Sequence, residues 1–247
     1  MPVTSAFVLW LNGLLMGIEA KAFQSIGFAP DAAAEQAVKV NQALALELLV
    51  AGGLILFFLI VRMTLKVEKP NPMQQVAEMI HEFSGSQGEQ VIGHGHERFQ
   101  AFVTCIFLFV VLNNLCGLVP GLETPTGNPS VPLGIALLTF LYYNFHGVRV
   151  QGVVGYLKHF AGPLWWISPL LFPIEVISHC ARVMSLTIRL YANMLASDLV
   201  TLVFFSLIPV AIPAVFLGLH FAVSIIQAYI FMVLSMIYLS MAVAHEH

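Results

Sequence analysis

Charged residues are scarce in this sequence. Only 9% of its 247 residues are Asp, Glu, Lys or Arg and 59% are hydrophobic, whereas a soluble domain carries about 25% charged residues. The basic residues form no run and the formal net charge is -3, so the chain lacks the positive surface that nucleic-acid binding requires. Its apolar residues form long blocks separated by short polar stretches. The sequence therefore predicts an all-α membrane protein.

Cysteines are also few, and their spacing does not suit a metal site. Cys105, Cys116 and Cys180 lie inside apolar blocks without a CxxC spacing. We interpret all three as small buried hydrophobic residues. The segment 93–98, GHGHER, offers two histidines and one acid with no further ligand nearby. We therefore expect no metal and no other cofactor.

The apolar blocks predict one membrane domain with about five membrane helices. Its expected segments are 1–41 outside the cytoplasm, 42–69 with the first transmembrane helix, 70–99 with an amphipathic helix on the cytoplasmic surface, 100–147 with a transmembrane hairpin, and 148–247 with a tilted helix pair. The first transmembrane helix ends in Arg62, Lys66 and Lys69. By the positive-inside rule, the N-terminus then lies outside and the C-terminus in the cytoplasm.

The last third of the chain contains unusually long apolar stretches. Residues 209–243 include no Lys, Arg, Asp or Glu, which is enough for about 52 Å of helix at 1.5 Å per residue. The hydrocarbon core of a bilayer is only ~30 Å thick. The preceding block, 165–207, is longer still and has no helix breaker after Pro173. We expect two long, steeply tilted helices side by side, with room for water-filled clefts above and below them.

Ionisable and polar residues lie at bilayer depth in this predicted pair, where such residues usually serve function. They are Glu175, His179, Arg182, Ser185, Arg189, Asn193 and Asp198 on the first helix, and His220 and Gln227 on the second. At 100° per residue, Ser185 and Asn193 share a face with Arg189. Asp198 falls nearly opposite. Arginine keeps its charge in an apolar setting, and since Glu175 is four turns away, we expect the counter-ion of Arg189 on another chain.

Two runs in this part of the chain resemble a known family. Residues 185–198, SLTIRLYANMLASD, resemble the signature segment of ATP synthase subunit a. The run that begins at His220, HFAVSIIQAYIFMVLSMIYLSMA, resembles the last helix of the same family. With residues 173–182, the resemblance covers the last ~75 residues closely, and the order of the other helices agrees with it.

The resemblance implies roles for individual residues of the helix pair. Arg189 matches the essential arginine of the family and Asn193 its neighbouring asparagine. Asp198 matches a position where the family often has glutamate, which is chemically equivalent. His220 and Gln227 match polar positions of the last helix.

Further matches lie near the two ends of the expected proton path. Glu175 matches an acid placed toward the cytoplasmic access path, and we expect His179, one turn further on, to act with it. In the second crossing, Asn114 matches a family asparagine. Gly117 stands where some members have an aspartate, so the outer entrance departs from the family's pattern.

The resemblance also implies a mechanism, in which each carboxylate of a rotating c-subunit ring is protonated from one cleft and releases its proton to the other. Arg189 stabilises the ionised carboxylate, so the proton leaves before the carboxylate passes. Asp198 and His220 form the expected outer relay. The other expected partners are the b-subunit peripheral stalk, the rest of the F1Fo complex, membrane lipid and protons. The chain is then a non-catalytic subunit in a bacterial plasma membrane.

Alternative interpretations exist for each of these residues. Arg189 could cap backbone carbonyls or extend to an interface, and Asp198 and His220 could form a hydrogen bond that only packs two helices. His179 and Gln227 could be packing residues in the same way. For the whole chain, the alternative is a self-contained secondary transporter or channel, which would need its own counter-ion and usually an internal repeat. An intramembrane hydrolase would need a Ser-His dyad, a zinc motif or paired aspartates, and we recognise none in the sequence.

Overall fold

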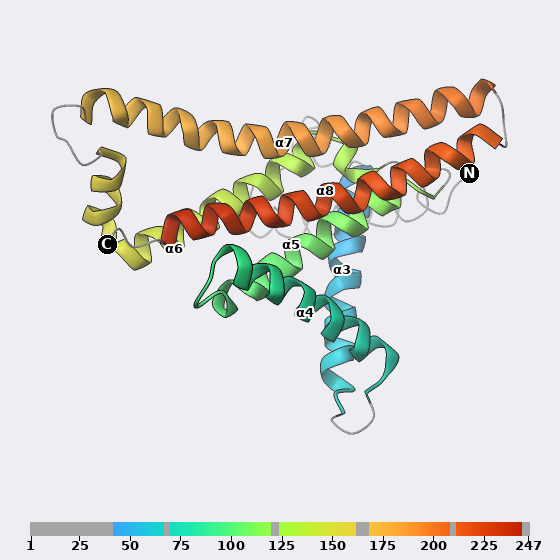
Figure 1. The fold of residues 1–247 in the computed structure, drawn as a ribbon. Helices are drawn as coiled ribbons and strands as arrows, with labels where there is room; N and C mark the ends of the chain where they lie inside the picture. Colours follow the sequence, from blue (N-terminus) through green and yellow to red (C-terminus); the bar gives the residue numbers. More distant parts are fainter. Residues whose placement is uncertain (1–41, 67–69, 120–123, 162–167, 208–210, 244–247) are drawn as a thin grey trace, which may run out of the picture.

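The computed structural model describes residues 42–66, 70–119, 124–161, 168–207 and 211–243. Within these residues all regular structure is helical (Figure 1). The elements are α3 (Gln42–Met63), α4 (Pro72–Val91), α5 (Glu97–Cys116), the short 3-10 helix η1 (Pro125–Gly127), α6 (Ser130–Ala161), α7 (Ser168–Leu207) and α8 (Ala211–Val243). The expected N-terminal segment 1–41 lies outside the described residues.

Five of these helices are long and apolar enough to cross a membrane. The candidate spans are Leu44–Met63, Glu97–Cys116, Ser130–Gly152, Pro169–Thr201 and Val215–Val243. The exception among the longer helices is α4, whose buried residues are polar or small, whereas Val76, Met79 and Phe83 are exposed. An exposed apolar face on a polar helix is typical of a helix that lies on a membrane surface. The predicted fold class, all-α with about five membrane helices and one amphipathic helix, is confirmed.

The last two helices are as long as the sequence predicts. α7 has 40 residues and α8 has 33, which correspond to about 60 and 50 Å. Pro173 lies inside α7 and does not end it. The two helices pack side by side and run in opposite directions (Figure 1). Helices of this length fit a ~30 Å hydrocarbon core only when they are strongly inclined to its normal.

Two helix boundaries differ from those that the sequence indicates. The amphipathic helix α4 ends at Val91, and α5 begins at Glu97 after a turn in which Gly93 has φ 80. α6 continues beyond the expected hairpin 100–147 and reaches Ala161, with a kink at Gly152, where φ is 75 and ψ is 160. Hydropathy marks where a helix leaves the apolar region and not where it ends, so the extension into a polar stretch was missed.

The hydrophobic core lies where α5, α6, α7 and α8 meet. One cluster of buried residues includes Val110, Leu190 and Phe231, and a second includes Phe99 and Met236. α8 packs against α5, α6 and α7 and thus lies at the centre of the bundle. Apolar residues of α5, α6, α7 and α8 therefore pack around the polar residues that lie between these helices.

The interpretation of the cysteines as buried residues is wrong for two of them. Cys105 and Cys180 are exposed, and Cys116 is partly buried. Each lies on a helix of membrane-spanning length. Lipid is as apolar as a protein core, so an apolar residue in such a helix does not have to face inward.

Candidate functional site

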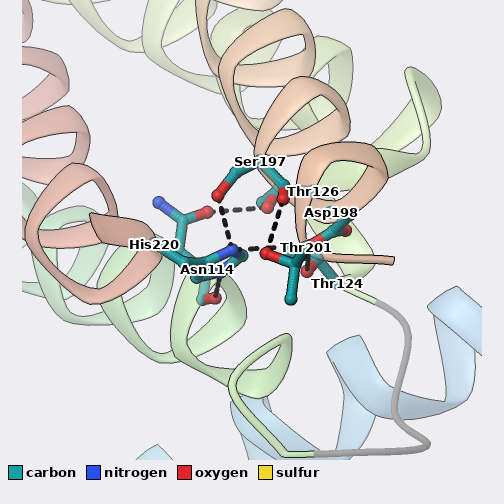
Figure 2. A network of polar contacts seen from close by, with 7 residues as sticks. All are labelled: Asn114, Thr124, Thr126, Ser197, Asp198, Thr201 and His220. Carbon is teal, nitrogen blue, oxygen red and sulfur yellow. Dashed lines mark hydrogen bonds and ion pairs between the residues drawn. The ribbon is translucent and has the colours of Figure 1, made fainter. Parts of the chain in front are cut away.

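His220 is the centre of a buried polar cluster between α5, α7 and α8 (Figure 2). Its side chain is 1% exposed. Nε2 lies 3.1 Å from the backbone oxygen of Asn114, and because a carbonyl oxygen only accepts, Nε2 carries the hydrogen. The other ring nitrogen, Nδ1, lies 2.8 Å from Ser197 Oγ. Nδ1 is therefore the ring nitrogen that faces α7.

Asp198 lies beside that nitrogen. Its Oδ1 is 3.5 Å from His220 Nδ1, and it accepts a hydrogen bond of 3.0 Å from the hydroxyl of Thr124. The Asp198 side chain is 33% exposed, so it connects a buried imidazole with the surface. The two residues that the sequence assigns to one relay are thus adjacent, although they are far apart in the chain.

Asn114 joins the C-terminal end of α5 to this cluster. The amide is fully buried. Its Oδ1 accepts a hydrogen bond of 2.6 Å from Thr126 in η1, and its Nδ2 donates to the backbone oxygen of Ser224 at 3.4 Å. Asn114 therefore joins the short 3-10 turn between α5 and α6 to α8, and Thr124 directly precedes this turn.

A second polar contact joins α7 to α8 nearer to Arg189. Asn193 Nδ2 donates to Gln227 Oε1 at 2.8 Å. On α8, Gln227 and His220 lie on one face with Ser224 between them. Ser224 Oγ is buried and makes no hydrogen bond to the described residues, which is rare for a buried polar atom without a water partner. The facing sides of the two helices thus carry a continuous polar stripe.

Arg189 lies at one end of this stripe. Its Nη2 donates to Ser185 Oγ, one turn earlier on α7, at 3.2 Å. No carboxylate of the described residues pairs with Arg189. Arg189 is itself partly buried, and Ser185 and Asn193, which share its face one turn before and after it, are exposed. A cation that never loses its charge therefore stands on a partly exposed helix face without a carboxylate of the described residues beside it.

A separate polar cluster lies toward the N-terminal end of α7. Glu175 Oε1 is 3.4 Å from His179 Nε2 and 3.8 Å from Arg182 Nη2. The hydroxyl of Tyr143 lies 2.8 Å from His179 Nδ1. Arg182 also stands over the ring of Tyr238, at 5.5 Å from its centroid. Hydroxyl, imidazole and carboxylate thus occur together here, as they do around His220.

Tyr156 lies next to this cluster, beyond the apolar span of α6. Its hydroxyl donates to Asn144 Oδ1 at 2.6 Å. Burial raises the pKa of Tyr156; the positive charge of Arg182 lowers it and the negative charge of Glu175 raises it further. The tyrosine is therefore held in its neutral form, in which it can donate this hydrogen bond.

Several residues of the two clusters were not identified from the sequence. Thr124 and Thr126 lie in a stretch rich in Gly, Pro and Thr that predicts only a turn, and Tyr143 lies in an apolar block. Ser197 directly precedes Asp198, and this adjacency was the one available signal. In each case the partner is on another helix, so local sequence could not show the contact.

Comparison with known proteins now decides the family. The sequence model of the ATP synthase A chain family matches residues 44–240. The chain belongs to this family. A relative from Koribacter versatilis (strain Ellin345), named ATP synthase subunit a, is 49% identical over 247 residues and covers all of both chains.

Two further relatives of this family member carry the same name. The one from Solibacter usitatus (strain Ellin6076) is 48% identical over 202 residues, which are 82% of this chain and 87% of the relative. The one from Bdellovibrio bacteriovorus is 38% identical over 175 residues, 71% of this chain and 76% of the relative. With five candidate spans and these relatives, this member of the ATP synthase A chain family is a multi-pass protein of a bacterial membrane.

Proposed function

We propose that this chain is the stator subunit a of a rotary F-type ATP synthase and forms two offset proton half-channels against a rotating c-subunit ring. It couples proton translocation to ATP synthesis. Membership of the ATP synthase A chain family supports the assignment. The observation that carries the mechanism is Arg189, a cation with no carboxylate partner in the described residues, on a partly exposed helix face.

Arg189 separates the two half-channels. A carboxylate on a passing ring helix supplies the counter-ion that Arg189 lacks, and the guanidinium stabilises the ionised form of that carboxylate. The proton therefore leaves the ring before the carboxylate reaches Arg189 and cannot cross directly. The membrane potential drives the cycle with about 2.3 kcal/mol per charge per 100 mV.

The cluster around His220 serves as the outer relay. Asp198 is partly exposed and takes up a proton, and Nδ1 of His220 lies within 3.5 Å to receive it. Ser197 hydrogen-bonds the same nitrogen. The stripe then continues through Ser224 to Gln227 and Asn193, which lies one turn from Arg189. Asp198 and His220 hold the proton, the Ser197 hydroxyl can pass it, and Ser224, Gln227 and Asn193 line the rest of the path with polar groups.

The cluster around Glu175 serves as the inner relay. Glu175 and His179 are 3.4 Å apart, and Arg182 keeps a positive charge beside the carboxylate. A proton released by the ring near Ser185 moves along α7 to this pair and leaves on the cytoplasmic side. With this assignment the N-terminus lies outside and the C-terminus in the cytoplasm, as the basic residues after α3 indicate.

The remaining partners follow from the same function. The c-subunit ring faces Arg189, and the b-subunit peripheral stalk holds the chain against rotation together with the rest of the F1Fo complex. The segments 1–41, 42–69, 70–99, 100–147 and 148–247 form one membrane domain, with the proton path in the last of them and in the residues of α5, η1 and α6 that contact it. A self-contained transporter is disfavoured by the family match.

The test is ATP-driven proton pumping in inverted membrane vesicles that carry Arg189→Ala. We expect pumping to disappear while the complex still assembles, which is checked by purification through another subunit. Arg149→Ala is the matched control, because Arg149 is an exposed arginine near the end of the candidate span Ser130–Gly152 of α6. This variant should pump as wild type does. Undiminished pumping by Arg189→Ala would overturn the proposed role of Arg189.

A further inference from the structure

Gly117 directly follows α5, and the side chain of Thr124 lies where a side chain at position 117 would be. A Cβ atom on Gly117 would overlap the Thr124 hydroxyl and would lie 3.1 Å from Cε1 and Nε2 of His220. The backbone of Gly117 has φ -67 and ψ -12, values that any residue adopts. Space, and not backbone conformation, is therefore what requires glycine here.

Thr124 uses its hydroxyl in an unusual way. It occupies the N-cap position of η1, yet its side chain makes no capping hydrogen bond, although threonine at an N-cap usually does. The hydroxyl instead donates to Asp198 Oδ1 at 3.0 Å (Figure 2). Thr124 is 4% exposed, so its side chain is held in this direction by its surroundings.

The oxygen that Thr124 holds is the one that faces the imidazole. Asp198 Oδ1 is also the atom that lies 3.5 Å from His220 Nδ1. Asp198 is partly exposed, and a donor on this oxygen favours the orientation of the carboxylate in which Oδ1 faces His220. A hydrogen bond to a charged group is strong enough to favour one orientation by about tenfold or more.

We propose that Thr124 is a positioning residue of the outer proton relay, which holds Asp198 Oδ1 against His220 Nδ1, and that Gly117 provides the space for its hydroxyl. The two residues form a matched pair, in which the hydroxyl occupies the position that a side chain at 117 would take. This inference rests on the proposed function of Asp198 and His220 as a relay.

The first test compares three threonine variants in ATP-driven proton pumping of the whole complex in inverted vesicles. Thr124→Val keeps the shape and removes the donor, so we expect about a tenfold lower initial rate in an assembled complex. Thr124→Ser keeps the donor and should restore most of the rate. Thr139→Val is the control, since Thr139 is fully buried and bonds only its own helix, at the Ile135 oxygen.

Two outcomes of this comparison would overturn the inference. One is a wild-type rate for Thr124→Val. The other is a loss in Thr124→Ser as large as that in Thr124→Val or larger, because a role in packing depends on the methyl group that serine lacks and not on the donor that it keeps. If Thr124→Val does not assemble, Thr124→Ala is measured in its place against Thr124→Ser, with the same expected difference.

The second test is a double-mutant cycle between the two positions. Gly117→Ala should displace the Thr124 hydroxyl and lower the rate about tenfold, and we expect the same loss for Thr124→Ala. Because both changes break the same contact, the double variant should also be about tenfold slower and not about a hundredfold slower. Additive losses would mean that Gly117 and Thr124 act independently, and the proposal that Gly117 provides space for the Thr124 hydroxyl would be wrong.

Asp198→Asn separates this inference from the proposed function. If Asp198→Asn pumps as wild type does, the outer relay itself is wrong. If Asp198→Asn is inactive while Thr124→Val remains fully active, the relay stands and only the positioning role of Thr124 fails.

Discussion

The hydroxyl of Tyr143 lies 2.8 Å from Nδ1 of His179, inside the bundle. His179 in turn faces Glu175 through Nε2 at 3.4 Å. Since the hydroxyl bonds one ring nitrogen and the carboxylate faces the other, a contact on each side fixes the orientation of the imidazole ring. The arrangement predicts that Tyr143 holds His179 with Nε2 toward Glu175, so that proton exchange with the carboxylate takes place at this nitrogen.

Tyr143→Phe should therefore slow proton release on the inner side. The phenol hydroxyl is lost while the ring and its packing remain, so we expect a fewfold to about tenfold lower rate of proton pumping with normal assembly. The measurement is the initial rate in inverted vesicles. Tyr142→Phe is the matched control, because Tyr142 packs its ring on Phe102; an equal loss in both variants would contradict a specific role for Tyr143.

Asn193 and Gln227 should be energetically coupled. Their 2.8 Å hydrogen bond joins α7 to α8, and loss of either partner should destabilise the helix contact by about 1 kcal/mol. In a double-mutant cycle of Asn193→Ala and Gln227→Ala, the second change should then cost much less than the first.

The measurement for this cycle is the thermal stability of the purified complex, read from the amount of intact chain after heating. Thr187→Val serves as the control on α7, because its hydroxyl bonds only the Val183 oxygen of the same helix. Independent, additive losses for the two alanine variants would show that the contact contributes nothing.

Gly152→Ala should lower the amount of assembled subunit. With φ 75 and ψ 160, Gly152 has a backbone conformation that is essentially restricted to glycine, and another residue there costs about 1–3 kcal/mol. Gly155→Ala is the control, since a Cβ at Gly155 meets only ordinary contacts, the nearest at 3.6 Å. Immunoblotting of membranes measures both, and equal levels would mean that the kink is dispensable.

The raised pKa of Tyr156 predicts that the folded protein loses stability at alkaline pH. Burial raises its pKa above the ordinary value of about 10, so the folded state holds the phenol proton more tightly than the unfolded state does. This contribution to stability is complete below about pH 10 and is lost as pH rises through the higher pKa of the folded state. Tyr156→Phe should therefore show a weaker loss of thermal stability above pH 10 than wild type. Identical pH profiles would contradict this.

Sequence alone predicted the helices well, because apolar blocks and basic ends are local features. The length of α7 and α8 followed from the absence of charge and of turn residues. The kink at Gly152 could not be predicted from the sequence, since a glycine in a polar stretch is equally compatible with a loop. The extension of α6 to Ala161 was missed for the same reason.

The candidate site was predicted in part. Helical periodicity separated Asp198 from Arg189, and the resemblance to the family indicated Asp198 and His220 together. Thr124 and Tyr143 could not be found in this way, because their partners lie 74 and 36 residues away in the chain. A hydroxyl in a turn or in an apolar block carries no signal until the fold brings its partner close.

The unbroken length of α7 has a mechanical consequence. In the proposed function, a ring carboxylate that moves past Arg189 exerts a sideways force on this residue, and α7 has to resist the force without bending. α7 is continuous from Ser168 to Leu207, with Pro173 near one end and far from Arg189, and α8 packs alongside it. The two antiparallel helices therefore resist bending together. The backbone hydrogen bonds of α7 are unbroken at Arg189, where the ring would exert its force.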